Sequence, residues 1–154
     1  MKWTYEDMDM FIKAKEYIDT VVLPLCPISF EDNLEETVGM SEFISLLTVP
    51  LEKQFKGRLL LLPRFTYLKG IERDLPFDYL LKWESELLQA GFKHIFYLTG
   101  DNEWVSYENK LNGTLITIFE TTIHSSDRKY QNIILEDKLK ELKFQLAKRW
   151  QTEE

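Results

Sequence analysis

The chain has 154 residues, and its 26 acidic side chains outnumber its 19 basic ones to give a net charge of −7. Because such a chain repels phosphate backbones, nucleic acid is disfavoured as a partner. Its single cysteine, Cys26, excludes an internal disulfide and a cysteine-rich metal site. No uncharged apolar segment reaches the roughly 18 residues of a membrane span, and Met1–Asp7 lacks the apolar core of a signal peptide. We expect one cytoplasmic domain over residues 1–154, with no metal and no cofactor.

The first part of the chain predicts a helix followed by a strand. Thr4 is a suitable N-cap for a helix that ends near residues 15–17. The β-branched residues of Ile18–Ile28 then favour a strand. Pro24 and Pro27 cannot donate hydrogen bonds to a sheet, so the second half of this strand is expected to bulge or to leave the sheet.

The next segment predicts a helix that follows an acidic stretch. Residues 30–40 are acidic and predict a loop or a short helix. Ser41 has the character of an N-cap, and apolar residues recur at helical spacing after it until Gly57. Pro50 interrupts this pattern, which indicates a kink or two consecutive short helices.

The middle of the chain repeats the alternation. The apolar run Arg58–Leu68 predicts a buried strand. Asp74 and Pro76 then indicate the start of a helix that ends at Gly91. The third strand is His94–Thr99, which ends at a strong turn signal.

The segment after the third strand has two interpretations. A short helix capped by Asp101 would return the chain for a parallel fourth strand over Thr114–Ile123. Alternatively, the Asn112-Gly113 turn would form a hairpin over residues 103–119. We favour the helix. A last helix carries an apolar stripe at helical spacing, formed by Leu135, Leu139, Leu142, Leu146 and Trp150.

Strand-like runs that alternate with helical segments are typical of an α/β layer fold. We therefore predict a three-layer Rossmann-like or flavodoxin-like domain with a mainly parallel four-stranded sheet. The alternative is a mixed sheet with the hairpin over residues 103–119. A parallel sheet would bring its ligand site to the edge formed by the carboxyl ends of the strands.

Several segments resemble a known family. These are Met1-Lys2-Trp3, Phe11, Ala14–Thr20, Pro24–Phe30 and Leu98–Asp101 with Trp104, and they are similar to the YpiF-like family of Bacillus-type bacteria. The resemblance covers the whole chain. That family is uncharacterised, so the resemblance implies no catalytic or binding residue.

No catalytic motif stands out in the sequence. The glycine-rich phosphate loops, the H-E-x-x-H zinc motif and the G-x-S-x-G nucleophile motif are all absent, and His94 is expected to be a structural histidine. The carboxyl edge nevertheless gathers candidate catalytic residues, Arg64, Asp101 and His124. It also gathers candidate ligand-binding residues, Ser29, Thr66, Thr99 and Ser125. The alternative is an ordinary solvated rim.

Two function classes follow. The first is a non-catalytic protein-interaction or self-associating module, in which Phe30, Phe65 and Tyr67 form a surface patch stiffened by nearby prolines. The alternative for these aromatic side chains is that they pack under the helices. The second class is a binder of an anionic metabolite or nucleotide, or an enzyme acting on one, that uses the carboxyl edge.

Overall fold

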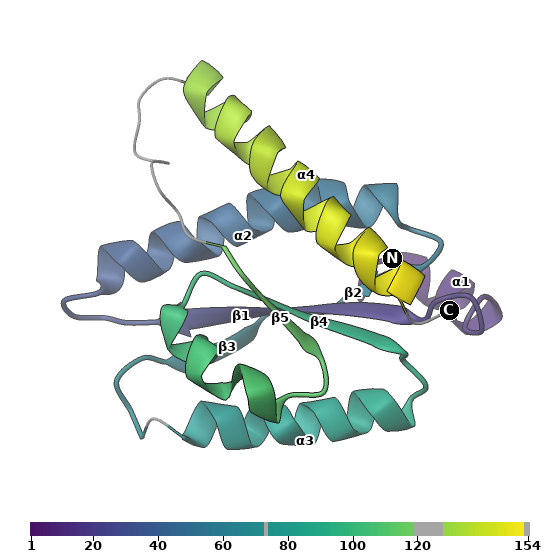
Figure 1. Cartoon of the computed structure of the whole chain (residues 1–154), viewed down its shortest axis with the longest axis horizontal. Coiled ribbons are helices and arrows are strands. Elements are labelled where there is room, and N and C mark those ends of the chain that lie inside the picture. Colours follow the sequence, from purple (N-terminus) through teal and green to yellow (C-terminus); the bar gives the residue numbers. More distant parts are fainter. Residues whose placement is uncertain (73, 119–127, 153–154) are drawn as a thin grey trace.

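The computed structural model describes residues 1–72, 74–118 and 128–152. It shows an open parallel sheet flanked by helices, as predicted (Figure 1). The strands are β1 (Thr20–Ile28), β2 (Leu59–Leu61), β3 (Phe65–Leu68), β4 (His94–Thr99) and β5 (Thr114–Thr117). The helices are α1 (Tyr5–Lys13), α2 (Leu34–Gln54), α3 (Leu75–Gln89), the 3₁₀ helix η1 (Asn102–Lys110) and α4 (Arg128–Thr152).

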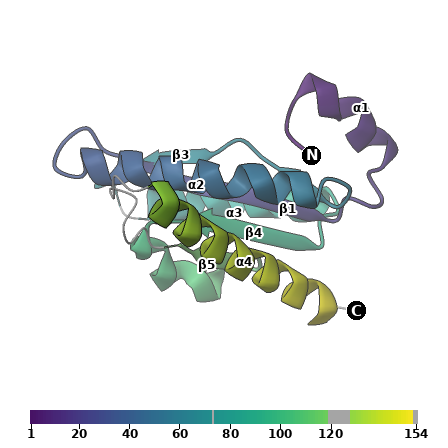
Figure 2. The ribbon, with the colours of Figure 1, turned by 90° about the horizontal axis from the view of Figure 1, so that it is seen from above.

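The sheet is buried on both faces. Its order is β2-β1-β4-β5, with β3 following β2 along the same side of β1, and every pairing is parallel. Helices α2 and α4 cover one face, α3 and η1 cover the other, and α1 stands at the amino end (Figures 1 and 2). Because side chains alternate along a strand, Leu23 and Leu25 join the core under α3, whereas Val22 and Cys26 join the core under α2 and α4. Cys26 is therefore a buried apolar residue, and burial raises the pKa of its thiol.

The prediction that β1 would bulge or leave the sheet at its prolines is wrong. The strand is continuous over nine residues at the centre of the sheet. In a parallel ladder, backbone groups of alternate residues face alternate neighbours. The carbonyl of Val22 accepts the N–H of Leu62, the residue after β2. The backbone of Pro24 therefore faces the same side, where the chain passes between β2 and β3. Pro27 faces the other side, beyond the last β4 partner, Thr99. Neither proline therefore removes a ladder hydrogen bond.

The predicted strand Arg58–Leu68 is two strands, so the sheet formed by the described residues has five strands rather than four. Val22 pairs with Leu61 and Leu25 pairs with Phe65. Three steps along β1 thus match four steps along the neighbouring chain, which is the signature of a bulge. Pro63 lies in the segment between β2 and β3 that contains the extra residue. The bulge changes which side chains face α3. Among the described residues β3 pairs with β1 alone and is an edge strand.

Helix α2 also differs from the prediction. It begins at Leu34, so Ser41 lies within the helix and is not its N-cap. Acidic residues in its first turn favour this earlier start because they complement the helix dipole. Pro50 does not divide the helix. The carbonyl that loses a partner belongs to Leu46, which is half exposed, so water can satisfy it.

The helix predicted after β4 is confirmed, and the hairpin alternative is wrong. Asp101 caps η1 and β5 runs parallel to β4. Glu84 of α3 holds the turn between η1 and β5 by accepting the backbone N–H groups of Asn112 and Gly113 at 2.9 and 3.0 Å. Gly113 is required here, since a Cβ atom would lie 2.7 Å from the Tyr97 ring.

Candidate functional site

Asp101 lies at the carboxyl end of β4 and is only 1% exposed. Its backbone N–H donates to Thr99 Oγ1 at 2.9 Å, and its Oδ1 accepts the N–H of Glu103 at 3.0 Å. Its Oδ2 accepts the hydroxyl of Tyr67 at 2.5 Å, and Lys69 Nζ lies 3.7 Å from Oδ1. The carboxylate is therefore fully engaged in capping η1 and in joining it to β3.

Tyr67 extends this network into the aromatic core. Its hydroxyl accepts a hydrogen bond from Trp104 Nε1 at 2.7 Å, and the two rings meet edge-on at 5.4 Å. Burial, followed by the bond to Asp101, raises the pKa of Tyr67 far above its usual range, so the hydroxyl stays a donor. The cavity beside these side chains holds only about 30 Å³, room for about one water. The network therefore joins β3 to η1 through internal hydrogen bonds.

Arg64 lies on the opposite face of the sheet. Its guanidinium donates to the hydroxyl of Ser41 on α2. Arg64 and Ser29 line a hollow of about 450 Å³, which we call the α2-side hollow. Its remaining lining is mostly apolar or hydroxylic, from Ile28, Phe30, Leu34, Thr37, Val38, Ser41, Glu42 and Ser45.

The predicted site is therefore divided. The structure brings Arg64 together with Ser29, and Asp101 together with Thr99, but on different faces. Thr66 is exposed on β3 between them. His124 and Ser125 lie outside the described residues, so the proposed acid–base pairing with Asp101 stays a prediction.

A second hollow of about 390 Å³ lies on the α3 side of β3, and sequence reasoning missed it. We call it the α3-side hollow. Four of its apolar side chains are 47–58% exposed: Leu68, Ile71, Leu75 and Tyr79. Its floor is Phe65, whose ring lies 5.8 Å from that of Tyr79. The available signal was the pair of Ile71, an apolar residue between the predicted strand and helix, and Leu75, an apolar residue at the start of that helix.

The predicted aromatic surface patch is only partly present. Phe65 is buried and Tyr67 is half-buried under α3 and η1, so these two rings follow the packing alternative. Phe30 is 77% exposed at the mouth of the α2-side hollow. A third hollow of about 570 Å³ lies beside α1 and is lined by Trp3, Tyr5, Met8, Phe11 and Ile12, among others.

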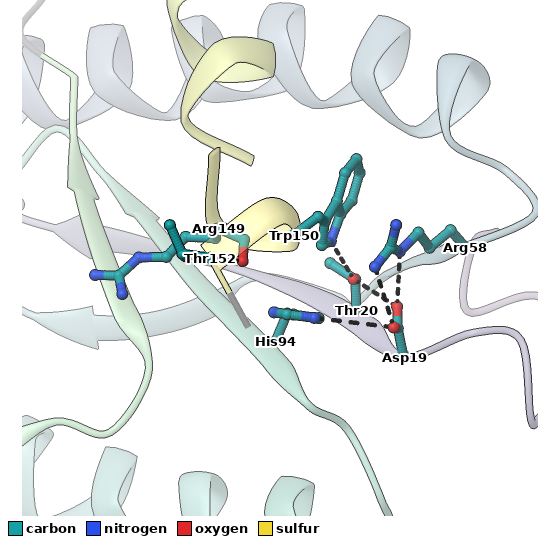
Figure 3. Close-up of polar contacts among 7 residues, drawn as sticks. All are labelled: Asp19, Thr20, Arg58, His94, Arg149, Trp150 and Thr152. Atoms are coloured by element: carbon teal, nitrogen blue, oxygen red, sulfur yellow. Dashed lines mark hydrogen bonds and ion pairs between the residues drawn. The ribbon is translucent and has the colours of Figure 1, made fainter. Parts of the chain in front are cut away.

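The amino end of the sheet carries a polar network that the sequence did not reveal (Figure 3). Arg58 donates twice to the carboxylate of Asp19, at 3.0 and 3.3 Å, and lies 4.2 Å from the Trp150 ring. Trp150 Nε1 donates to Thr20 Oγ1 at 2.8 Å. Buried His94 lies 3.9 Å from Asp19, in the structural role expected of it. The network fastens the end of α4 to the sheet.

The electrostatics of Asp19 show why the network is stable. Burial by itself raises the pKa of this carboxyl, but hydrogen bonds from Arg58 and Thr20 outweigh it and hold the pKa below its usual value. The ionised form is therefore the one that the fold stabilises. Within the described ranges, no group of three His, Cys, Asp or Glu side chains could hold a metal ion.

Comparison with known proteins gives a family but no activity. Among the described residues, no helix combines the length and apolar character needed to cross a bilayer. No solved structure matches the chain. The chain is 33% identical over 152 residues to the uncharacterized protein YpiF of Bacillus subtilis (strain 168), which covers 99% of each chain. Residues 9–150 match the family described as "Protein of unknown function (DUF2487)". The chain thus belongs to this family, which confirms the resemblance of its segments to the YpiF-like proteins.

Proposed function

We propose that this chain is a non-catalytic, cytoplasmic protein-interaction module that binds an extended segment of a partner along the outer edge of β3. The observation that carries the proposal is that this edge strand has a hollow on each face of the sheet beside it. Extended segments bind sheet edges through main-chain hydrogen bonds, and pockets for alternate side chains give specificity.

The backbone of β3 supports this mode of binding. Lys69 N–H donates to the carbonyl of Ile28, so the backbone N–H and C=O groups of Tyr67 and Lys69 face β1. The groups of Thr66 and Leu68 consequently face outward. The neighbouring β2 differs, because its Leu61 N–H donates to the Met1 carbonyl at 2.7 Å. Within the part of the chain that the structure describes, β3 pairs with β1 alone.

The side chains around this edge favour the binding of a protein partner over catalysis. The α3-side hollow exposes four apolar side chains together, and clustered exposed apolar groups mark interaction sites. The candidate acid, Asp101, is fully engaged in internal bonds and faces a cavity of about 30 Å³. That arrangement leaves no room for a substrate beside the carboxylate.

A photo-crosslinker placed at Thr66 in living cells tests the proposal. Phe144 on α4, 69% exposed and apolar, is the matched control position. We expect a discrete protein adduct from position 66 and none from position 144. A separate edge variant, Thr66→Pro, removes one outward N–H without touching the bonds to β1, and with the crosslinker moved to Leu68 it should abolish the adduct that Thr66→Ala retains.

Two outcomes would overturn the proposal. One is an adduct pattern that is the same at positions 66 and 144. The other is an adduct at Leu68 that Thr66→Pro leaves intact while its thermal unfolding matches that of Thr66→Ala. An adduct formed only between two copies of the chain would show self-association through the same edge.

A further inference from the structure

We propose that the segment bound by β3 carries a carboxylate side chain that pairs with Arg64, and beside it apolar side chains that fill the α3-side hollow. This inference rests on the proposed function and names the chemistry of the partner. The juxtaposition of one accessible guanidinium and an apolar hollow along a single edge strand carries it.

The bulge before β3 sets which side chains a partner would meet. Phe65 and Tyr67 face the core under α3, so Arg64 and Thr66 point to the α2 face by alternation, whereas Leu68, the last residue of β3, lines the α3-side hollow. A bound strand alternates in the same way. Its side chains on one face therefore meet Arg64 first, and those on the other face meet the α3-side hollow.

Arg64 is suited to a carboxylate of a partner, because within the described residues it forms no ion pair, not even with Glu42 of the same hollow. Its described partner is the Ser41 hydroxyl, a neutral acceptor. Across residues 1–72, 74–118 and 128–152, no carboxylate forms an ion pair with it. A guanidinium presents several donors in a planar fork, which matches the two oxygens of a carboxylate.

The other cation beside β3 is already used. Lys69 is 17% exposed at its side chain and lies 3.7 Å from Asp101. Positive charge is therefore available at the start of β3 and neutralised at its end. This asymmetry orients the partner, with its acid near Arg64 and its apolar residues near Leu68, Ile71 and Leu75.

A second copy of the chain fits this site less well than a different protein. In a symmetric antiparallel pairing of two β3 edges, residues that face each other share a face of the sheet. Arg64 would then lie opposite Thr66, Leu68 or Gly70 of the copy, and none of these carries a negative charge. Self-pairing would leave the guanidinium without its carboxylate.

The test uses the intact chain and a display library of random eight-residue peptides as the probe. Peptides are kept when Thr66→Pro releases them and Thr66→Ala does not. We expect the kept sequences to share an Asp or Glu, with apolar residues at alternate positions on one side of it. For one such peptide, Arg64→Gln should weaken binding about tenfold, as expected for a charge-assisted hydrogen bond. Changing the peptide acid to its amide should do the same, and both changes together should add nothing further.

The outcomes separate this inference from the proposed function. Edge-dependent peptides without an acidic residue, or an unchanged affinity in Arg64→Gln, would overturn the inference and leave the proposed function standing. No peptide sensitive to Thr66→Pro would count against both. Succinate tests whether the site binds a free small carboxylate. By itself it should not change the melting temperature of the wild-type chain. A shift that Arg64→Gln abolishes would assign the site to a small carboxylate and overturn the inference.

Discussion

Two arginines, six residues apart on either side of β2, have opposite surroundings. Arg58 donates twice to Asp19 and lies against the Trp150 ring, so it holds three elements together. Arg64 meets a serine hydroxyl in a hollow open to solvent. The amino end of the sheet thus satisfies its charges internally, whereas the edge at β3 leaves donors and apolar side chains exposed. Residue type alone does not show whether the fold pairs a cation with a carboxylate; the groups within reach of that cation do.

The largest effect is expected from removal of the Trp150 ring at the amino end of the sheet. Trp150→Ala should lower the free energy of unfolding by about 3–5 kcal/mol, as for other large aromatic truncations, because the ring packs against Phe55 and Arg58 and donates to Thr20. Urea unfolding followed by circular dichroism measures it. Phe144→Ala on the same helix is the control and should change stability by less than about 0.5 kcal/mol. Equal losses in both variants would contradict the assigned role of Trp150.

The arginines themselves give the most direct comparison. Arg58→Gln should cost about 1–2 kcal/mol of stability, because it leaves the partly buried Asp19 carboxylate with fewer donors. Arg64→Gln should stay within about 0.5 kcal/mol of the wild type, as for an ordinary surface change. The same urea titration at neutral pH measures both. A larger loss from Arg64→Gln would mean that this side chain is structural.

The dependence of the free energy of unfolding on acidic pH tests the role of the Asp19 charge at the amino end of the sheet. The folded-state pKa of Asp19 lies below its unfolded value near 3.8, so the ionised carboxyl stabilises the fold above that value. This stability is lost as the pH falls through the folded pKa. The stability gap between the wild type and Asp19→Asn should therefore be wide at pH 7 and narrower at pH 3. A gap that does not change with pH would show that the charge of Asp19 is not what stabilises the network.

The smallest effect on stability is expected at the open edge. Leu68 is 47% exposed, so Leu68→Ser should change the free energy of unfolding by no more than about 0.5 kcal/mol. The same substitution should weaken the partner adduct of the Thr66 crosslinker, since it removes apolar surface from the α3-side hollow. A stable variant that keeps the full adduct would remove Leu68 from the proposed binding surface.

Much of the fold could be predicted because its signals are local. The stripe of α4 is an example, since Leu142, Leu146 and Trp150 recur at helical spacing and are buried as expected. The cap at Asp101 and the end of α3 near Gly91, with its φ of 99°, are also local backbone chemistry. Pro24 and Pro27 misled the prediction because the cost of a proline depends on what lies beside it. That neighbour belongs to another part of the chain.

The sequence by itself determined the alternation of helices and strands and the burial of both sheet faces, since periodicity and capping act within a few residues. Only the tertiary structure decided that the Asp101 carboxylate would accept a hydrogen bond from Tyr67 of another strand. It also decided that Arg64 would lie on the α2 face of the sheet and not beside Asp101. The bulge between β2 and β3 changes the registration of side chains by one residue, and a shift of one residue sends a strand side chain to the other face. A long-range pairing therefore divided residues that a simple parallel edge would have gathered.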